Sequence, residues 1–324
     1  MKETSNKPPL LIIAGPTAIG KSSLAVTLAK QIGGEVVSAD SMQVYRGMNI
    51  GSAKITTEEM RGIPHHGIDI LDPWEEFHVV KFQQMAKQAI TEIHERGRIP
   101  ILTGGTGFYI QAILYDIDFT QMEQDNEYRL QLEQTAQQKG ASYLHEQLQK
   151  VDPKSAQTIH PHNSKRIIRA LEFHKLSGCP ISEHNNSQHE KEPAYQTSFF
   201  VLTDDRAKIY ERINKRVEDM IAAGLVAEVQ ELQNKGCHDK MTSMQGLGYR
   251  EILAYLNKKC TLDQAIDDIK KNTRHFAKRQ LTWFRRERET IWLDRQEYGD
   301  EKALVCAILQ KSCAVRPGNT TPKT

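Results

Sequence analysis

The chain has 324 residues, of which 39% are hydrophobic, so it is long enough to bury a sizeable core and is typical of a globular protein. Its 43 Lys and Arg residues nearly balance its 41 Asp and Glu residues, so the net charge of +2 does not by itself indicate a polyanionic partner. The five cysteines form no CxxC pair, which favours free thiols and a cytoplasmic location. No stretch reaches the roughly 18 apolar residues of a membrane span, and the first apolar run is too short for a signal peptide.

The first part of the chain alternates strand-like and helix-like segments. Apolar runs predict strands at 10–14, 35–40 and 98–105, and helical periodicity predicts helices at 21–32 and 79–97. This rhythm predicts an α/β fold, with a parallel sheet, right-handed crossovers and ligands at the carboxyl ends of the strands.

The middle of the chain has a different character. From 116 to 195 polar helix formers dominate, and the patterns predict helices at 126–140, 141–151 and 163–178. The polar stretch 182–196 contains few aliphatic residues and predicts a loop. We therefore expect an all-α insertion domain at 116–195.

After the insertion the chain returns to the sheet. The run TSFFVLT at 197–203 predicts a core strand, and the remainder is expected to be helical at 205–235, 249–257 and 262–288. Segments 1–115 and 196–312 then form the α/β core with basic C-terminal helices, and 313–324 is expected to be a disordered tail.

A phosphate-binding loop is the most specific local motif. The sequence GPTAIGKS at 15–22 matches GxxxxGK[ST] and lies between a predicted strand and a predicted helix, as in P-loop NTPases. Its backbone N–H groups can surround phosphate oxygens, Lys21 adds a positive charge, and Ser22 can ligate Mg²⁺. The predicted phosphate-binding residues are Gly15, Pro16, Thr17, Ala18, Ile19, Gly20, Lys21 and Ser22.

Asp40 follows the second predicted strand. In phosphoryl transfer such a carboxylate binds Mg²⁺, although a strand-end Asp can also cap a turn, and the residue alone does not decide. The polar residues Ser41, Gln43 and Tyr45 follow closely. A guanine switch is disfavoured because NKKC at 257–260 lacks the Asp of NKxD.

Two further motifs are less specific. The glycines of ILTGGTGFYIQAIL at 101–114 permit close approach of a ligand, to which Thr106 could bond, but a tight strand-to-helix turn explains them equally well. The histidines of PHHGID at 64–69 are adjacent and point apart on regular backbone, so we expect structural or hydrogen-bonding roles rather than a metal site.

A basic helix is predicted near the C-terminus. Residues 270–288 contain eight Lys or Arg and one Glu. Helical spacing places Phe276 and Trp283 opposite a basic stripe made of Lys271, Arg274, Lys278 and Arg285. A second basic cluster, Lys165, Arg166 and Arg169, lies in the predicted insertion. A solvated charged face is the usual explanation, but two such elements favour a cleft that binds RNA or DNA.

Taken together, these motifs resemble those of the tRNA dimethylallyltransferases, also called tRNA isopentenyltransferases. They occur in family order over about residues 10–290. The matching words are GPTAIGKS (15–22), DSMQVYR (40–46), PHHGIDILDP (64–73), GGTGFYI (104–110), KRIIRALE (165–172), MIAAGLVAEV (220–229), GLGYRE (246–251) and TRHFAKRQLTWFRR (273–286).

The resemblance implies transfer of a dimethylallyl group from dimethylallyl diphosphate to N6 of the adenine 3′ of the anticodon, position 37, with release of diphosphate. It implies that Thr17 to Ser22 hold the diphosphate, with contacts from Arg216 and, as its companion, Arg212. Mg²⁺ is the expected cofactor, held by Ser22 with Asp40 as a second candidate ligand. The implied catalytic residues are Asp40 as the base, Lys21, Thr106 and Arg216.

The implied partner is the anticodon stem-loop of tRNA, whose target base must leave its stack to enter a channel. We expect a monomer without a membrane partner. No zinc is expected, because the tail lacks the CxxC…HxxxH of eukaryotic relatives. The implied tRNA-binding residues are Asp40, Ser41, Met42, Gln43, Thr106, Lys165, Arg166, Ile167, Ile168, Arg169, Gln245, Gly246, Leu247, Gly248, Tyr249, Arg250, Lys278, Arg279, Gln280, Trp283 and Arg285.

Three alternatives remain open. An isopentenyltransferase acting on free adenine nucleotides would share the phosphate loop and base, but would not need the insertion or the basic helix. A small-molecule P-loop kinase would transfer the γ-phosphate of ATP. An RNA-binding P-loop NTP switch would use the loop for regulation.

Overall fold

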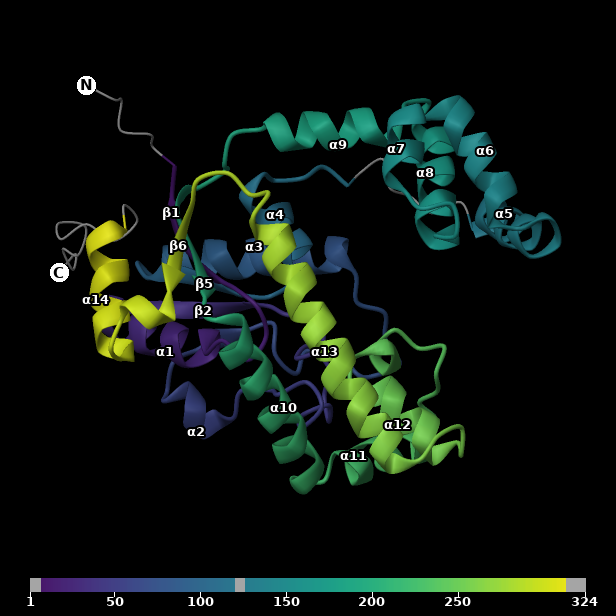
Figure 1. Ribbon diagram of the computed structural model, residues 1–324. Coiled ribbons are helices and arrows are strands. Elements are labelled where there is room, and N and C mark those ends of the chain that lie inside the picture. The colour runs from purple at the N-terminus through teal and green to yellow at the C-terminus, as the bar shows by residue number, and fades with distance from the viewer. Residues whose placement is uncertain (1–6, 120–125, 313–324) are drawn as a thin grey trace. The chain divides into compact units, whose positions relative to one another are not determined.

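The computed structural model (Figure 1) describes residues 7–119 and 126–312, so the predicted tail at 313–324 lies outside the described residues. The chain divides into two compact units, Met1–Leu114 with Ala194–Thr324, and Tyr115–Pro193. The boundaries lie one or two residues from those expected at 116 and 195. Within the described ranges, no helix is long and apolar enough to span a lipid bilayer.

The first unit is built on a six-stranded sheet whose strands are all parallel, in the order β3-β2-β4-β1-β5-β6. The predicted α/β fold is therefore confirmed, and the three early strands and the strand near 200 are present. The strands are β1 (Pro9–Ala14), β2 (Gly34–Ala39), β3 (His65–His66), β4 (Ile99–Gly104), β5 (Gln196–Thr203) and β6 (Thr290–Asp294).

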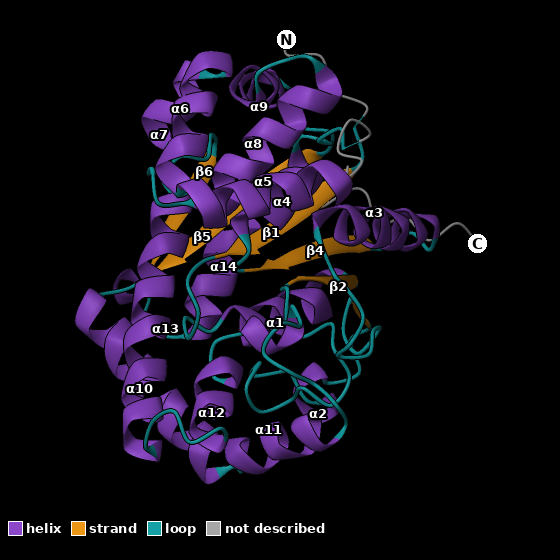
Figure 2. Cartoon of the chain, turned by 90° about the vertical axis from the view of Figure 1, so that its right-hand side faces the viewer, coloured by secondary structure: helices purple, strands orange, loops and turns teal. Residues whose placement is uncertain are grey.

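Helices cover both faces of this sheet. Figure 2 shows the strands in orange, with α1 on one side and α3 and α4 on the other. Leu11, Ile13 and Phe200 are fully buried among residues of α1 and α10. Strands buried on both faces are near-continuous apolar runs, which is why periodicity identified them. The helices of this unit are α1 (Lys21–Ile32), α2 (Thr57–Met60), α3 (Val79–Glu95), α4 (Gly107–Leu114), α10 (Arg206–Ala222), α11 (Leu225–Asn234), α12 (Tyr249–Leu256), α13 (Leu262–Phe284) and α14 (Glu301–Lys311).

The prediction that the end of the chain is wholly helical is wrong. β6 adds a sheet strand there, pairing Val201 with Trp292 and Leu202 with Leu293. The helical stretch expected at 205–235 also divides into α10 and α11 at Gly224, whose φ of 99° an L side chain rarely adopts. The helix expected at 262–288 ends at Phe284.

The adjacent histidines belong to the short edge strand β3. His66 Nε2 lies 2.7 Å from Oε2 of Glu35, and His65 Nδ1 lies 2.8 Å from the carbonyl oxygen of Ile63. Glu35 is 2% exposed and also accepts hydrogen bonds from Arg96 and Arg98. The expected hydrogen-bonding role of the histidines is confirmed, and His66 is one of the partners of a buried carboxylate of β2.

The second unit is entirely helical in its described part. Leu144, Leu148 and Ile167 are fully buried and form its small core together with Leu132 and Ile168. The helices are α5 (Asn126–Lys139), α6 (Ala141–Val151), α7 (Pro153–Thr158), α8 (Ser164–Ser177) and α9 (Ile181–Glu190). The predicted helices correspond to α5, α6 and α8.

The prediction of a loop at 182–196 is wrong, because α9 occupies most of this stretch. The side chain of Asp152, 1% exposed, accepts hydrogen bonds from the backbone N–H and hydroxyl of Ser155, in the first turn of α7. It also accepts bonds from the N–H and hydroxyl of Ser182, at 3.0 and 2.6 Å, in the first turn of α9. Ile181 packs against the core of the unit. A cap thirty residues away is not visible in local composition.

We predict that Asp152→Ala lowers the free energy of local opening of α9 by about 2–4 kcal/mol, because four hydrogen bonds to one carboxylate are lost. Amide hydrogen exchange of residues 181–190 measures this. Asp300→Ala, which removes the cap of α14 through Ala303, is the matched control and should leave α9 unchanged.

The stabilisation that Asp152 gives to α9 depends on pH. Burial raises the pKa of Asp152, but the bonds from Ser155 and Ser182 outweigh this and hold its pKa below the usual value. The stabilisation is therefore complete above about pH 4 and is lost as the pH falls through the lowered pKa. Equal α9 exchange in the variant and the parent protein would contradict this role.

Candidate active site

A cavity of about 750 Å³ lies in the first unit, where the loops after β1, β2 and β4 meet. Ligands of parallel sheets bind at the carboxyl ends of the strands, so its location agrees with the fold. Residues of α10, α13 and the segment before α12 complete the wall. The sequence-predicted residues that line it are Thr17, Ala18, Gly20, Lys21, Ser22, Asp40, Ser41, Met42, Gln43, Thr106, Arg216, Gln245, Gly246, Leu247, Arg250, Arg279 and Gln280.

The phosphate loop leads from β1 into α1, which begins at Lys21. Gly15 has a φ of 147°, and a Cβ there would lie 2.8 Å from the carbonyl oxygen of Leu202. Gly20 has a φ of 89°, and a Cβ there would lie 2.6 Å from Nη1 of Arg295. That guanidinium donates a 2.8 Å hydrogen bond to the carbonyl oxygen of Ile19. Arg295 thus holds the outer side of the loop, a contact that nothing in the local sequence indicates.

Lys21 is the cation of the loop. Its Nζ donates a 2.7 Å hydrogen bond to the carbonyl oxygen of Pro16. The pKa of Lys21 is lowered to about 7, because burial and the positive charge of Arg216 lower it more than the carboxylate of Asp40 raises it. Burial also lowers the pKa of Arg216, against the opposing charges of Glu59 and Asp40. The charges of two cations, Lys21 and Arg216, and two carboxylates, Asp40 and Glu59, therefore meet at this cavity.

Asp40 follows β2 directly and shapes the turn after it. Its Oδ1 accepts hydrogen bonds from the backbone N–H groups of Met42, at 2.8 Å, and Gln43, at 3.3 Å. The turn-capping role considered for this residue is therefore real, and because Asp40 also lines the cavity, it does not exclude chemistry there. Arg212 does not line the cavity, and its guanidinium pairs instead with Asp204 at the end of β5.

The glycines after β4 are required by protein contacts. A Cβ on Gly104 would lie 2.2 Å from the carbonyl oxygen of Ala39, and one on Gly105 would lie 2.0 Å from Nε2 of Gln280. Gly107 is similarly close to Trp283. The turn is thereby pressed against the end of β2, with the N–H of Thr106 3.4 Å from the carbonyl oxygen of Ala39. Thr106 and Asp40 share the cavity because of this packing.

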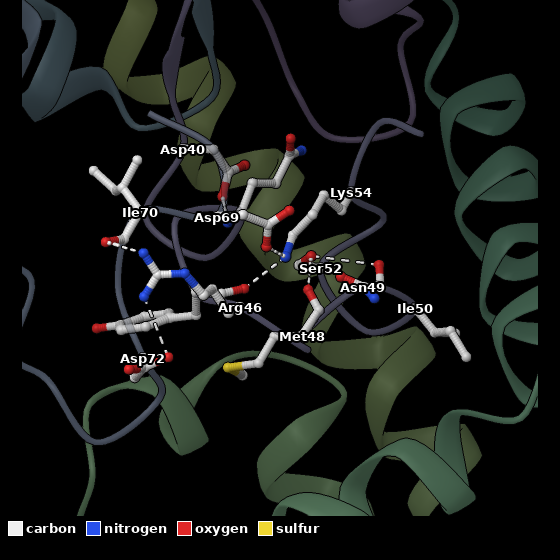
Figure 3. Close-up of polar contacts among 12 residues, drawn as sticks. Asp40, Arg46, Met48, Asn49, Ile50, Ser52, Lys54, Asp69, Ile70 and Asp72 are labelled. Atoms are coloured by element: carbon white, nitrogen blue, oxygen red, sulfur yellow. Dashed lines mark hydrogen bonds and ion pairs between the residues drawn. The ribbon is translucent and has the colours of Figure 1, made fainter. Parts of the chain in front are cut away.

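The loop that follows Asp40 forms one wall of the cavity and is bound to its surroundings by side chains. Figure 3 shows Lys54 directed at Asp69, and its Nζ donates hydrogen bonds of 2.5 Å to Asp69 Oδ1 and to the carbonyl oxygen of Tyr45. Arg46 points the other way and bonds Asp72 and the carbonyl oxygen of Ile70. The residues after DSMQVYR therefore have a defined conformation.

Glu228 of α11 anchors the far end of the same loop. Its carboxylate accepts hydrogen bonds from three successive backbone N–H groups, those of Asn49, Ile50 and Gly51, at 2.8 to 3.1 Å. The hydroxyl of Tyr249 donates a 2.8 Å bond to Glu228 and accepts one from the N–H of Ser52. Glu228 lies within the motif MIAAGLVAEV, which the sequence analysis identified without a role.

Several residues predicted to bind RNA are buried instead. Tyr249 is 0% exposed and is committed to Glu228 and Ser52, and Gly248 is buried next to it. Ile167 and Ile168 are 0% and 4% exposed and lie in the core of the helical unit. Their burial argues against the predicted RNA contacts, because a single motif contains both inward-facing and outward-facing positions. Lys165 and Arg166 are exposed, and Arg169 is half-buried.

The basic helix α13 differs from its predicted orientation. Its buried stripe consists of Ala265, Ile269, Ala277, Gln280 and Phe284, whereas Phe276 and Trp283 are only half-buried. Trp283 packs against Phe108, with ring centroids 6.3 Å apart. Arg274 was expected in the basic stripe, but its Nη1 donates a 2.6 Å hydrogen bond to the side chain of Asn214 in α10. Lys271, Lys278, Arg279 and Arg285 are exposed and available to an anionic partner.

The residues at the phosphate loop could hold a metal ion that is bound partly by substrate, such as Mg²⁺, but not one that is bound by protein ligands alone. In the described ranges, no cluster of three or more His, Cys, Asp or Glu could hold a metal ion. The hydroxyl of Ser22 and the carboxylate of Asp40 line the same cavity. Mg²⁺ is typically bound through one or two protein oxygens together with substrate phosphates, and these two groups supply that kind of site.

Comparison with known proteins identifies the family. The family model described as IPP transferase matches residues 43–287. The chain is 53% identical to the tRNA dimethylallyltransferase of Lachnoclostridium phytofermentans over 93% of this chain and 96% of that one. It resembles the crystal structure of the full-length tRNA isopentenylpyrophosphate transferase from Bacillus halodurans, with 46% identity, a TM-score of 0.70 and coverage of 94% and 97% of the two chains.

A eukaryotic dimethylallyltransferase acting on tRNA is more distant in sequence, with 31% identity, and has a TM-score of 0.79 over 93% of this chain and 78% of that chain. The match of the family model covers well over half of the sequence, and the relatives match it nearly end to end. The phosphate loop, Asp40 and the glycine turn gather at one cavity in a chain that belongs to the IPP transferase family.

Proposed function

We propose that this protein transfers the dimethylallyl group of dimethylallyl diphosphate to N6 of adenine 37, 3′ of the anticodon, in tRNA, and releases diphosphate. The observation that carries the proposal is the single cavity that holds both Lys21 of the phosphate loop and Asp40 beside the glycine turn. The family membership of the chain and the activities for which its relatives are named support the substrate class. The proposal places this activity in the cytoplasm, in a monomer.

The phosphate loop would bind the leaving group. The C–O bond of an allylic diphosphate breaks when the departing charge is neutralised, and the loop amides, Lys21 and Arg216 are positioned to do this. Ser22 and Asp40 would hold Mg²⁺, which would supply further charge neutralisation to the diphosphate when bound. No attacking water has to be positioned, which distinguishes this reaction from NTP hydrolysis.

Asp40 would accept the proton of the acceptor base. The lone pair of adenine N6 is conjugated into the ring, so N6 becomes acidic only as the new C–N bond forms, and a carboxylate is then a sufficient base. Oδ1 of Asp40 is held by two backbone N–H groups, which fixes the carboxylate at the cavity. Thr106, in the turn pressed against the same strand end, would orient the base by a hydrogen bond.

RNA would reach the cavity along the edge formed by α13 and the segment before α12. Arg250 and Arg279 are exposed and also line the cavity, so phosphates could be bound where the flipped base enters. The remaining exposed cations of α13, among them Lys278 and Arg285, extend this basic surface away from the cavity.

The proposal is tested by incubating the protein with Mg²⁺, labelled dimethylallyl diphosphate and undermodified tRNA, with AMP in a parallel reaction. Label in the tRNA supports the proposal. Label only in AMP would favour the free-nucleotide enzyme, and ADP formation from ATP in a coupled assay would favour a kinase. No label in either acceptor would contradict prenyl transfer.

We predict that Asp40→Asn lowers turnover by about 10²-fold or more, because the amide keeps the acceptor for Met42 and Gln43 but cannot take up a proton. Single-turnover transfer and tRNA binding are measured together. Asp40→Ala, which also removes the turn contacts, is the comparison. An equal loss of tRNA binding and turnover in Asp40→Asn would indicate a positioning role instead.

The pKa of Lys21 predicts how diphosphate binding depends on pH. Because this pKa is about 7 in the free protein, most Lys21 is neutral at pH 8, and a bound anion must raise the pKa. Binding of inorganic diphosphate at pH 8 should therefore take up a proton, and affinity should fall by up to about tenfold per pH unit above 7. Calorimetry in buffers of different ionisation enthalpy measures the uptake.

Lys21→Met is the matched control for this experiment, since it is of similar length and cannot titrate. It retains the pH dependence that belongs to diphosphate itself. The difference between the parent protein and Lys21→Met is the contribution of Lys21, and a difference of zero would show that this lysine does not change its charge on binding.

We predict that Lys278→Ala weakens tRNA binding and reduces the slope of log K against log salt by about 0.7–0.9, the value of one phosphate contact. Lys302→Ala is the control, since Lys302 is an exposed lysine on α14 and does not line the cavity. Titration at several salt concentrations separates the two. A slope equal to that of the parent protein would remove Lys278 from the RNA surface.

A further inference from the structure

Gln280 is a polar residue in the buried stripe of α13, and it joins two loops of the candidate active site. Its Oε1 accepts a 2.9 Å hydrogen bond from the backbone N–H of Thr17 in the phosphate loop. Its Nε2 donates a 2.9 Å hydrogen bond to the carbonyl oxygen of Gly105 in the glycine turn. The side chain is 6% exposed, so both ends of the amide are used inside the protein.

The position of this amide is fixed from both sides. Ala277 and Phe284, one turn before and one turn after it on the same face of α13, are 1% and 0% exposed. On the other side lies Gly105. A Cβ at this position would lie 2.0 Å from Nε2 of Gln280, so only glycine leaves space for the amide. A buried amide with a donor and an acceptor both satisfied holds its partners at a set spacing.

The two loops that Gln280 joins have different roles in the proposed reaction, since one would bind the diphosphate and the other carries Thr106. The phosphate loop continues from Thr17 to Lys21, and the glycine turn continues from Gly105 to Thr106. The N–H of Thr17 is committed to Gln280, so the amides left for a diphosphate are those nearer the start of α1. A shift of the two loops against each other would change the distance between leaving group and acceptor.

We propose that Gln280 is a positioning residue for prenyl transfer, which sets the spacing between the phosphate loop and the turn that carries Thr106. It acts through these two loops and not by contact with RNA. The inference rests on the proposed function for the identity of the two substrates. Misplacement of reacting groups by about 1 Å can cost about 10²-fold in rate, so the amide bridge bears on kcat more than on substrate affinity.

Two substitutions separate this role from a general effect on stability. Gln280→Met has a similar size and removes both hydrogen bonds. Gln280→Glu restores them only when its carboxyl is protonated, because the hydroxyl then donates to Gly105 while the carbonyl accepts from Thr17. The ionised form places an oxygen against the carbonyl of Gly105 and adds a negative charge to the diphosphate site.

The expected result is a split between binding and turnover. Gln280→Met should lower kcat for prenyl transfer by about 10-fold to 10²-fold at every pH, with the Kd for tRNA within about twofold of the parent value. The kcat of Gln280→Glu relative to the parent should rise as the pH falls from 8 to 6, since burial favours the protonated carboxyl. Gln230→Glu, which adds the same charge on the exposed surface of α11, should give a flat ratio near one.

The alternatives give different results. Loss of tRNA affinity in Gln280→Met with kcat preserved would make Gln280 an RNA contact and overturn the proposal. Equal behaviour of the Glu and Met variants at all pH values would also overturn it, because the amide geometry would then be irrelevant. Circular dichroism and thermal unfolding exclude variants that fail to fold.

Hydrogen exchange provides a readout that is independent of the reaction. In Gln280→Met the amide of Thr17 should exchange about tenfold faster, the equivalent of one lost hydrogen bond, while amides in β1 stay unchanged. If the parent protein transferred no label to tRNA, the proposed function would fail, and this exchange would still decide whether Gln280 holds the loop. Unchanged exchange at Thr17 would contradict the bridge itself.

Discussion

Lys21 brings its ammonium group into a cavity where burial and a second cation, Arg216, together lower its pKa to about 7. The carboxylate of Asp40 opposes both cations, and that of Glu59 opposes Arg216. Like charges brought together in this way favour a ligand with more than one negative charge, since such a ligand restores the charged form of Lys21. Backbone contacts hold two of these groups in place, because Lys21 bonds the carbonyl oxygen of Pro16 and Asp40 accepts from the N–H groups that follow it.

The order of the strands explains why these groups meet. β4 lies between β2 and β1, so the loops that follow the three strands emerge side by side at one edge of the sheet. The phosphate loop follows β1, Asp40 follows β2, and the glycine turn follows β4. Gly104 allows the turn to approach Ala39 at the end of β2 more closely than any side chain would permit. The strand order places the three loops near one another, and the glycines after β4 allow the turn to touch the end of β2.

Much of this fold and part of this site can be predicted from sequence. The strands β1, β2, β4 and β5 each contain a short apolar run, and the phosphate loop and Asp40 directly follow two of them, so local pattern is enough to find these elements. The missing elements depend on distant partners: α9 is capped by Asp152, and β6 is a short strand defined by its pairing with β5. Arg295 and Glu228 likewise act through backbone groups far away in the sequence, so no local pattern could have identified them.

A sequence motif does not show which of its residues face the core and which face solvent. In TRHFAKRQLTWFRR, Lys278 and Arg279 face solvent, while Gln280 is buried one residue later and bonds two loops of the cavity. A polar residue in the stripe of Ala277 and Phe284 is the signal that could have revealed this, had the buried face been placed correctly. One helix thus serves two physically different purposes. Its exposed cations bear on how tightly an anionic partner is held, and its buried amide bears on the geometry of the reacting groups, so substitutions on the two faces should change different kinetic constants.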